Sequence, residues 1–139
     1  MLYYIMEEIN KKAEIIIGVF LLLNKNKKNF LLYSICFILN RILKEVCRYS
    51  MGDIAWPLLG NGNRPNSNIS SYGMPSGHSQ AVGFFIAHQI KTKSNYLIPS
   101  VLISLEIMYS RIANGHHTLQ QVVVGFLIGL FFGLKTIKH

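Results

Sequence analysis

The residues of this sequence best suited to chemistry are two histidines, two arginines and a Ser-Gly turn. The turn, Pro75 to Gly77, leads into an apolar stretch, so His78 follows a predicted helix start whose free N–H groups and positive dipole end favour an anion. Arg111 is followed after five residues by His117, and Arg64 precedes a proline upstream. Guanidinium groups neutralise phosphate oxygens, and imidazoles attack phosphorus or donate protons. The combination indicates a phosphoryl-transfer site, although an ordinary helix start with a packed histidine would give the same Pro-Ser-Gly-His run.

These residues lie in three motifs that resemble the signatures of the type 2 phosphatidic acid phosphatase superfamily, which are Lys-x6-Arg-Pro, Pro-Ser-Gly-His and Ser-Arg-x5-His-x3-Asp. The second signature is intact at Pro75 to His78, and the third reads Ser110-Arg111-x5-His117-x3-Gln121, with Gln in place of Asp. The first is incomplete: Arg64-Pro65 is present, but nineteen residues separate Arg64 from the nearest upstream lysine, Lys44. The resemblance covers roughly residues 40 to 133.

The glutamine of the third motif is similar to the residue found in the dolichyl diphosphatase and glucose-6-phosphatase branches. Leu39-Asn40-x3-Lys44 and His117-Thr118-x2-Gln121 look most like the dolichyl diphosphatase branch. The resemblance therefore implies a membrane enzyme that hydrolyses a lipid phosphate or diphosphate, with polyprenyl (dolichyl) diphosphate to monophosphate as the favoured reaction. Phosphatidic acid is the alternative substrate within the same chemistry. A catalytically inactive membrane scaffold is the alternative from another class, supported by the incomplete first motif and the short chain.

The resemblance also implies a role for each site residue. His117 resembles the family nucleophile, which forms a phosphohistidine intermediate, and His78 resembles the acid that protonates the leaving oxygen. If a helix begins at His117, Gln121 shares its face and would accept the other ring N–H of His117, which fixes the tautomer. The residues expected to bind the phosphate are Arg64, Arg111, Ser76, Gly77 and Lys44. No metal or cofactor is implied, because the carboxylates are too few and too scattered for a two-metal phosphatase.

Composition and charge favour a membrane protein. The 139 residues suit a single domain, half of them are apolar, only 14% are charged, and the apolar residues come in blocks. The net charge of +8 does not indicate nucleic-acid binding, because the lysines sit in short loops and no basic stripe is interleaved with aromatic residues. We divide the domain into an N-terminal helix and loop, residues 1–29, and a motif-bearing core, residues 30–134.

The apolar blocks predict an all-α bundle of about five helices embedded in a membrane. The expected helices are residues 2–23, 30–46, 76–90, 95–112 and 117–134, with a polar turn at 24–29 and a long loop at 50–71. The charged first half of the first helix would lie at the membrane interface, and its second half would enter the bilayer. Glycines recur every four residues at 125, 129 and 133, a spacing that lets another helix pack closely.

Five alternating helices place the candidate site at one end of the bundle and most loop lysines at the other. Seven lysines lie in the loops 24–29 and 91–95 and at the C-terminus: Lys25, Lys27, Lys28, Lys91, Lys93, Lys135 and Lys138. By the positive-inside rule, their end of the bundle is cytoplasmic. The sequence therefore predicts a multi-pass membrane protein whose active site faces the lumen of an endoplasmic-reticulum-like membrane or, in a bacterium, the periplasmic side of the plasma membrane.

Overall fold

The fold consists of five α-helices. The computed structural model of the chain describes residues 2–23, 27–66, 68 and 71–138, with the side chains of residue 8 and of those from residue 11 onward. The helices are α1 (Leu2–Leu23), α2 (Lys27–Met51), α3 (Gly77–Lys91), α4 (Leu97–Ala113) and α5 (Leu119–Thr136). Apart from an isolated bridge between Trp56 and Gly60, the described residues contain no β-structure, which confirms the expected all-α class.

Two predicted boundaries around α2 are wrong. Residues 24–26 of the predicted polar turn lie outside the described residues, but Lys27 to Asn29 are already helical. At its other end α2 continues through Met51, so the long loop begins at Gly52 instead of Ser50. Polar side chains were read as a turn and a loop here, although on an exposed helix face they are equally well solvated.

The start of α5 also differs from the prediction, because Thr118 caps this helix. The Thr118 hydroxyl accepts from the backbone N–H of Gln121, and the Gln121 side chain accepts from the backbone N–H of Thr118. This reciprocal capping box satisfies two N–H groups that a helix start leaves without partners. The helix therefore begins at Leu119, and His117 precedes it instead of forming its first turn.

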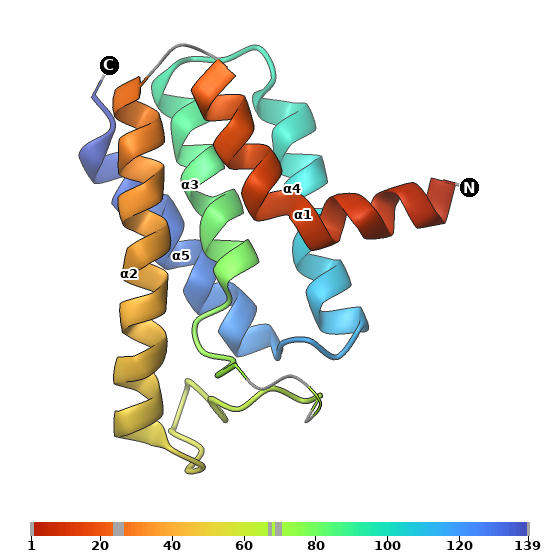
Figure 1. Cartoon of the computed structure of the whole chain (residues 1–139), viewed down its shortest axis with the longest axis vertical. Coiled ribbons are helices and arrows are strands. Elements are labelled where there is room, and N and C mark those ends of the chain that lie inside the picture. The colour runs from red at the N-terminus through yellow and green to blue at the C-terminus, as the bar shows by residue number, and fades with distance from the viewer. Residues whose placement is uncertain (1, 24–26, 67, 69–70, 139) are drawn as a thin grey trace.

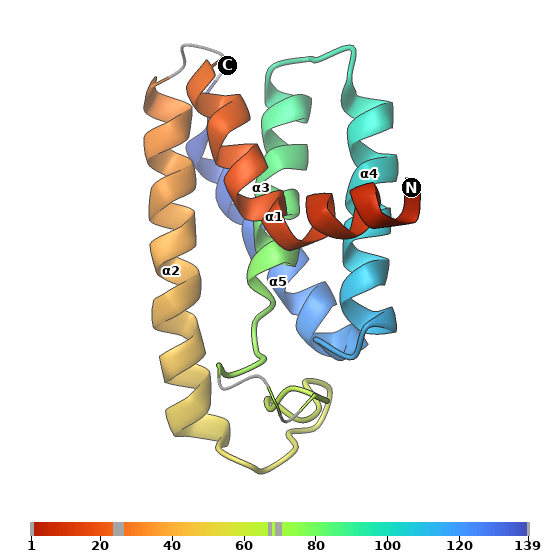
Figure 2. The same cartoon turned by 45° about the vertical axis from the view of Figure 1, so that its right-hand side comes forward.

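The central helix is α3, which contacts the other four helices. Figure 1 shows the motif-bearing end of the bundle at the bottom, where α2 and α4 end and α3 and α5 begin. The opposite end holds the described loop lysines, and Figure 2 shows the same separation from another side. In both views α1 bends, so that its first half lies across the direction of the other helices and its second half runs along them. The expected separation of the site from the lysines is present, while its orientation in a membrane stays a prediction.

Glycines let α3 and α5 approach at backbone distance. A Cβ at Gly125 would overlap the carbonyl oxygen of Ser76, and one at Gly129 would overlap that of Gln80. A third glycine, Gly133, faces the methyl group of Ala87 one turn further along. The four-residue spacing therefore serves close helix packing, as expected, and it places the start of α5 directly against the Pro75–His78 turn.

We expect Gly129→Ala to destabilise the protein by about 2–3 kcal/mol, because the added methyl group meets backbone that cannot rotate away. The sign of the effect is diagnostic, since Gly to Ala inside a helix otherwise stabilises by about 1 kcal/mol. Thermal unfolding in detergent measures the change. An unchanged or raised Tm would contradict the close packing of α3 and α5.

The surface of the bundle is rich in exposed apolar side chains. By length and composition, one helix of the described residues, α5, is long and apolar enough to cross a membrane. The outer faces of the other helices also carry large exposed apolar residues: Ile15, Leu22, Leu23, Leu31, Ile38, Ile42, Ile98, Leu102 and Leu105. One candidate span does not establish several, so the multi-pass arrangement stays a prediction.

Candidate active site

A pocket of about 150 Å³ lies at the end of the bundle where the sequence motifs meet. Its walls come from α1, α2, the long loop, the first residues of α3, the last turn of α4 and the residue before the α5 cap. The lining residues are Glu14, Phe37, Asn40, Arg41, Lys44, Arg64, Ser71, Gly77, His78, Arg111 and His117. Six of the eight predicted site residues are in this set, whereas Ser76 and Gln121 are completely buried and do not line the pocket.

Cationic side chains dominate the lining. Arg41, Lys44, Arg64 and Arg111 are positively charged, and the one carboxylate among the lining residues is that of Glu14. Arg111 is only 9% exposed, and its Nε has no hydrogen-bond partner among the described residues. A buried guanidinium with an unused donor, close to three further cations, favours an oxyanion of high charge such as a phosphate.

Arg64 is held beside His117 by backbone and hydroxyl groups of the loops around it. Its Nε donates to the Ser71 carbonyl at 2.8 Å, and its Nη2 donates to Ser71 Oγ at 2.9 Å. Its Nη1 donates to the His116 carbonyl at 3.0 Å and lies 3.0 Å from Nε2 of His117. These contacts fix a guanidinium that belongs to an irregular loop, so it enters the pocket in a defined position.

The contact with Arg64 determines which ring nitrogen of His117 carries the proton. A guanidinium has no acceptor, so Nε2 of His117 accepts from Arg64 and holds a lone pair. The proton is therefore on Nδ1, which lies 3.0 Å from Oε1 of Gln121 and donates to it. His117 lines the pocket with an unprotonated Nε2, which is the form that a nucleophile requires.

The Gln121 amide is itself oriented by backbone groups. Its Nε2 donates to the carbonyls of Asn61 at 3.0 Å and Asn63 at 2.7 Å, and its Oε1 accepts from the Thr118 N–H at 3.3 Å. Exchanging the amide oxygen and nitrogen would set oxygen against two carbonyl oxygens, so the oxygen must face His117. The predicted contact is present, but the expected reason for it, a shared helical face, is wrong because His117 precedes the Thr118 cap.

Burial, and after it the positive charge of Arg64, lowers the pKa of His117 to about 3. The hydrogen bond to Gln121 acts in the opposite direction but does not offset these effects. Because an unperturbed histidine titrates near pH 6.5, the His117 ring stays neutral across the physiological range. A proton donor for catalysis must therefore be another group of the pocket.

His78, at the start of α3, contacts α1. Its Nδ1 lies 3.1 Å from Oε1 of Glu14, and its Nε2 lies 3.3 Å from the backbone carbonyl of Lys11. Both neighbours are hydrogen-bond acceptors, so both contacts are satisfied when each ring nitrogen carries a proton. The two histidines of the pocket thus have opposite surroundings: donors face His117 Nε2, and acceptors face His78.

Ser76 and Gly77 start α3 in different ways. The Ser76 hydroxyl is the N-cap, accepting from the Ser79 N–H at 3.5 Å and from the Ser79 hydroxyl at 3.0 Å. It is therefore directed into the helix start, and its contact with a phosphate stays an untested prediction. Gly77 lines the pocket, and a Cβ there would lie 2.6 Å from Oε1 of Glu14 and 3.2 Å from Oδ1 of Asn40. A larger residue at this position would therefore displace the Glu14 carboxylate from its place beside the turn.

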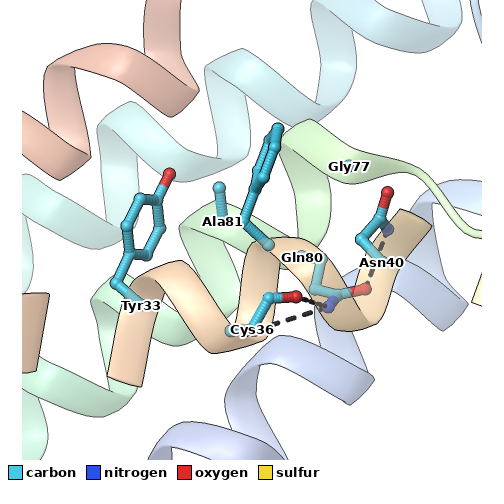
Figure 3. Close-up of a pocket in the computed structure, with 7 residues that line it drawn as sticks. Tyr33, Cys36, Asn40, Gly77, Gln80 and Ala81 are labelled. Atoms are coloured by element: carbon cyan, nitrogen blue, oxygen red, sulfur yellow. Dashed lines mark hydrogen bonds between the residues drawn. The ribbon is translucent and has the colours of Figure 1, made fainter. Parts of the chain in front are cut away.

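Asn40 and Gln80 tie α2 to α3 next to this turn (Figure 3). Asn40 Nδ2 donates to Gln80 Oε1 at 2.9 Å, and Gln80 Nε2 donates to the Cys36 carbonyl at 2.8 Å. Asn40 Nδ2 is also 3.4 Å from the Pro75 carbonyl. These buried contacts hold the Pro-Ser-Gly-His turn against α2.

Lys44 lines the pocket, but its ammonium group binds backbone. Nζ donates to the carbonyls of Tyr72 at 2.9 Å, Gly73 at 3.4 Å and Pro75 at 2.8 Å. Three carbonyls match the three donors of an ammonium group. Lys44 thus holds the loop segment before α3 in place. With its three donors occupied, Lys44 can act on a phosphate only through its positive charge, and its predicted direct contact with the phosphate would require these hydrogen bonds to break.

Comparison with known proteins identifies the family. A profile of the PAP2 superfamily matches residues 31–138. The chain belongs to the PAP2 superfamily. It is similar to a dolichyldiphosphatase of Saccharomyces cerevisiae, with 31% identity over 109 residues that cover 69% of this chain and 44% of the yeast protein. The chain therefore spans less than half the length of this relative. No solved structure matches the chain.

Membership of the PAP2 superfamily confirms the resemblance drawn from the three motifs, and the yeast relative agrees with the dolichyl diphosphatase branch. The sequence motifs did not indicate four lining residues, which are Glu14, Phe37, Arg41 and Ser71. A signal existed for Glu14, because a carboxylate at the edge of a dense apolar run is costly unless it has a partner. The PAP2 superfamily match begins at residue 31, so α1 and Glu14 lie outside it.

Proposed function

We propose that this PAP2 superfamily protein hydrolyses a lipid phosphate or diphosphate within a membrane, without a metal and through a phosphohistidine intermediate. The observation that carries the proposal is the unprotonated Nε2 of His117, held beside Arg64 in a pocket lined by four cationic side chains. The favoured reaction is the conversion of polyprenyl (dolichyl) diphosphate to the monophosphate, which the similarity to the yeast dolichyldiphosphatase supports.

In the proposed reaction, Arg64 and Arg111 neutralise the phosphate oxygens, with the Gly77 N–H at the helix start and the charge of Lys44 nearby. His117 Nε2 attacks the terminal phosphorus, and an N–P bond forms as the bond from that phosphorus to the leaving oxygen breaks. The leaving oxygen belongs to the lipid monophosphate when the substrate is a diphosphate, and to the lipid alcohol when it is a monophosphate. His78 gives its proton to the leaving oxygen. Water then attacks phosphorus, the N–P bond breaks, and the neutral His78 takes a proton from that water. Inorganic phosphate leaves, and both histidines return to their starting states.

The exposed apolar faces support the membrane location. Large apolar side chains are exposed on α1, α2, α4 and α5. The outer surface that they form is unfavourable in contact with water and favourable in contact with lipid. The described loop lysines lie at the end of the bundle opposite the pocket, as the positive-inside rule requires of an extracytoplasmic site. We therefore propose a multi-pass arrangement with the site facing the lumen, or the periplasmic side of a bacterial plasma membrane.

An apolar groove of about 460 Å³ between α1 and α2 supports a lipid as the substrate. The groove shares Glu14 and Phe37 with the cationic pocket, so the two spaces adjoin. Its other lining residues continue away from the pocket along both helices: Ile15, Gly18, Val19, Leu22, Phe30, Tyr33, Ser34 and Ile38. If the phosphate of a lipid binds in the pocket, its hydrocarbon chain could therefore lie in the adjoining apolar groove, which leads away from the pocket along α1 and α2.

We expect Ser34→Trp to raise the KM for polyprenyl diphosphate about tenfold, because filling the groove displaces roughly two methylene groups at about 0.8 kcal/mol each. The rate with p-nitrophenyl phosphate, which has no chain, should fall by a much smaller factor. Ile35→Trp is the matched control, since Ile35 is exposed on the same helix and does not line the groove. Equal effects of the two substitutions on the lipid would contradict the groove as the site of the chain.

The proposed function is tested by phosphate release from polyprenyl diphosphate and from phosphatidic acid, using detergent-solubilised protein in the presence of a chelator. Release that persists with the chelator supports a metal-free hydrolase, and the lipid cleaved faster identifies the substrate class. Release that stops on chelation would overturn metal independence. If folded protein releases phosphate from neither lipid, the inactive scaffold becomes the better account.

A further inference from the structure

We infer that Glu14 is a positioning residue for His78, so that α1, which lies outside the segment matched by the PAP2 superfamily, completes the active site. This inference rests on the proposed function, in which His78 is the proton donor. Its basis is the ion-pair contact of 3.1 Å between Oε1 of Glu14 and Nδ1 of His78. Both side chains are largely buried, with exposed fractions of 23% for Glu14 and 16% for His78.

The surroundings of Glu14 fix its position relative to His78. The Tyr33 hydroxyl of α2 donates a hydrogen bond to the Glu14 backbone carbonyl at 2.6 Å. This bond fixes the position of α1 along the axis of α2. Gly77 leaves the space that the carboxylate occupies, because a Cβ there would lie 2.6 Å from Oε1. The same helix supplies a second acceptor, the Lys11 carbonyl, 3.3 Å from His78 Nε2. Two acceptors on α1 thus hold the His78 ring from both of its nitrogens.

The charges of the pocket explain why a carboxylate is needed there. The other ionisable groups that line the pocket are Arg41 and Lys44 of α2, Arg64 of the long loop, Arg111 of α4 and the neutral His117. Four of these groups are cations, which repel a protonated ring. Glu14 is the anion among the lining residues, and its contact with Nδ1 attracts the imidazolium and holds its orientation.

This arrangement serves both steps of the proposed reaction. In the first step, His78 Nε2–H turns from the Lys11 carbonyl to the leaving oxygen and gives up its proton, while Nδ1–H stays hydrogen-bonded to Glu14. In the second step the neutral ring, still held at Nδ1, accepts the proton of the attacking water at Nε2. Glu14 neither gains nor loses a proton, and it acts on the substrate only through His78.

The test compares Glu14→Gln with the wild type on two monophosphate esters, dodecyl phosphate and p-nitrophenyl phosphate. The alkoxide leaving group needs a proton and the nitrophenolate does not. We expect kcat for dodecyl phosphate to fall about 10²-fold, with a much smaller loss for p-nitrophenyl phosphate. Glu8→Gln is the matched control on the same helix, because Glu8 pairs with Lys11 and Lys12 and does not line the pocket. Glu14→Asp, whose shorter side chain draws the carboxylate away from His78, should give the same pattern. This variant replaces Glu14→Gln in the test if Glu14→Gln folds poorly.

A double-mutant cycle with His78→Ala completes the test. If Glu14 acts through His78, adding Glu14→Gln to His78→Ala should cause little further loss on either ester. Equal losses of Glu14→Gln on both esters, or full additivity with His78→Ala, would overturn the positioning role while leaving the proposed function intact. Lack of phosphatase activity in the wild type would instead overturn the proposed function, and the role of Glu14 with it.

Discussion

Replacing His117 by asparagine should abolish phosphate release from any lipid that the wild type hydrolyses, with a loss of at least about 10³-fold in kcat. Asparagine keeps a polar group near Gln121 but has no ring nitrogen that can attack phosphorus. The remaining pocket still contains Arg64 and Arg111, so binding should be weakened much less than turnover. A large loss in kcat with a small change in KM is therefore the expected pattern.

The neighbouring histidine is the control for this substitution. His116 contributes its backbone carbonyl to Arg64, but its side chain does not line the pocket. His116→Asn should retain activity within a few-fold of the wild type. Quenching the wild type during turnover with alkaline detergent, which preserves the acid-labile N–P bond of a phosphohistidine, should trap phosphate on the protein, and the trapped phosphate should be absent in His117→Asn. Turnover by His117→Asn at the wild-type rate would exclude His117 as the nucleophile.

The sequence predicted the contents of the site well where a motif links residues on neighbouring elements. The Pro75–His78 turn and the Arg111–His117 spacing bring both histidines to one pocket, because the start of α3, the end of α4 and the start of α5 lie at the same end of the bundle. The incomplete first motif did not prevent Arg64 from reaching His117. The position of Arg64 is fixed by hydrogen bonds to Ser71 and to the His116 carbonyl. These contacts join irregular segments, which the periodicity of a sequence does not predict.

The sequence was less informative about residues whose role depends on tertiary contacts. Lys44 was predicted to bind phosphate because its charge matched a motif, but its ammonium group lies against three carbonyls of the loop. Glu14 is distant in sequence from every motif, and only the packing of α1 against α3 brings it to His78. The start of α5 was predicted at His117 because a helical face shared by His117 and Gln121 would explain their contact. In the structure Thr118 caps the helix, and Gln121 both completes this capping box and orients His117.

That double use of Gln121 leads to a second large effect, expected for Gln121→Glu. The change keeps the oxygen that accepts from His117 and replaces the amide nitrogen that donates to the carbonyls of Asn61 and Asn63. When the pH is above the pKa of the introduced carboxyl, a carboxylate oxygen would face the two carbonyl oxygens in a fully buried position. Two lost donors at about 1–3 kcal/mol each predict a destabilisation of about 3 kcal/mol and a loss of order 10²-fold in kcat/KM at pH 8.

The pH dependence separates this mechanism from simple loss of the fold. Protonating the introduced carboxyl restores one O–H donor to the Asn61 and Asn63 carbonyls, so the variant should regain stability as the pH falls from 8 to 5. The wild type should change in the opposite sense. The pKa of His117 is lowered to about 3 in the folded protein, so the unfolded chain binds more protons and acid destabilises the wild type below about pH 6.5.

Gln120→Glu provides the control, because it adds the same charge to the exposed first turn of α5, where the helix dipole favours it. This variant should keep the Tm and the pH profile of the wild type. Thermal unfolding and kcat/KM measured between pH 5 and 8 for all three proteins distinguish the outcomes. A Gln121→Glu variant as stable and active as Gln120→Glu at pH 8 would show that the two carbonyls do not orient the amide. The tautomer of His117 would then depend on Arg64 alone.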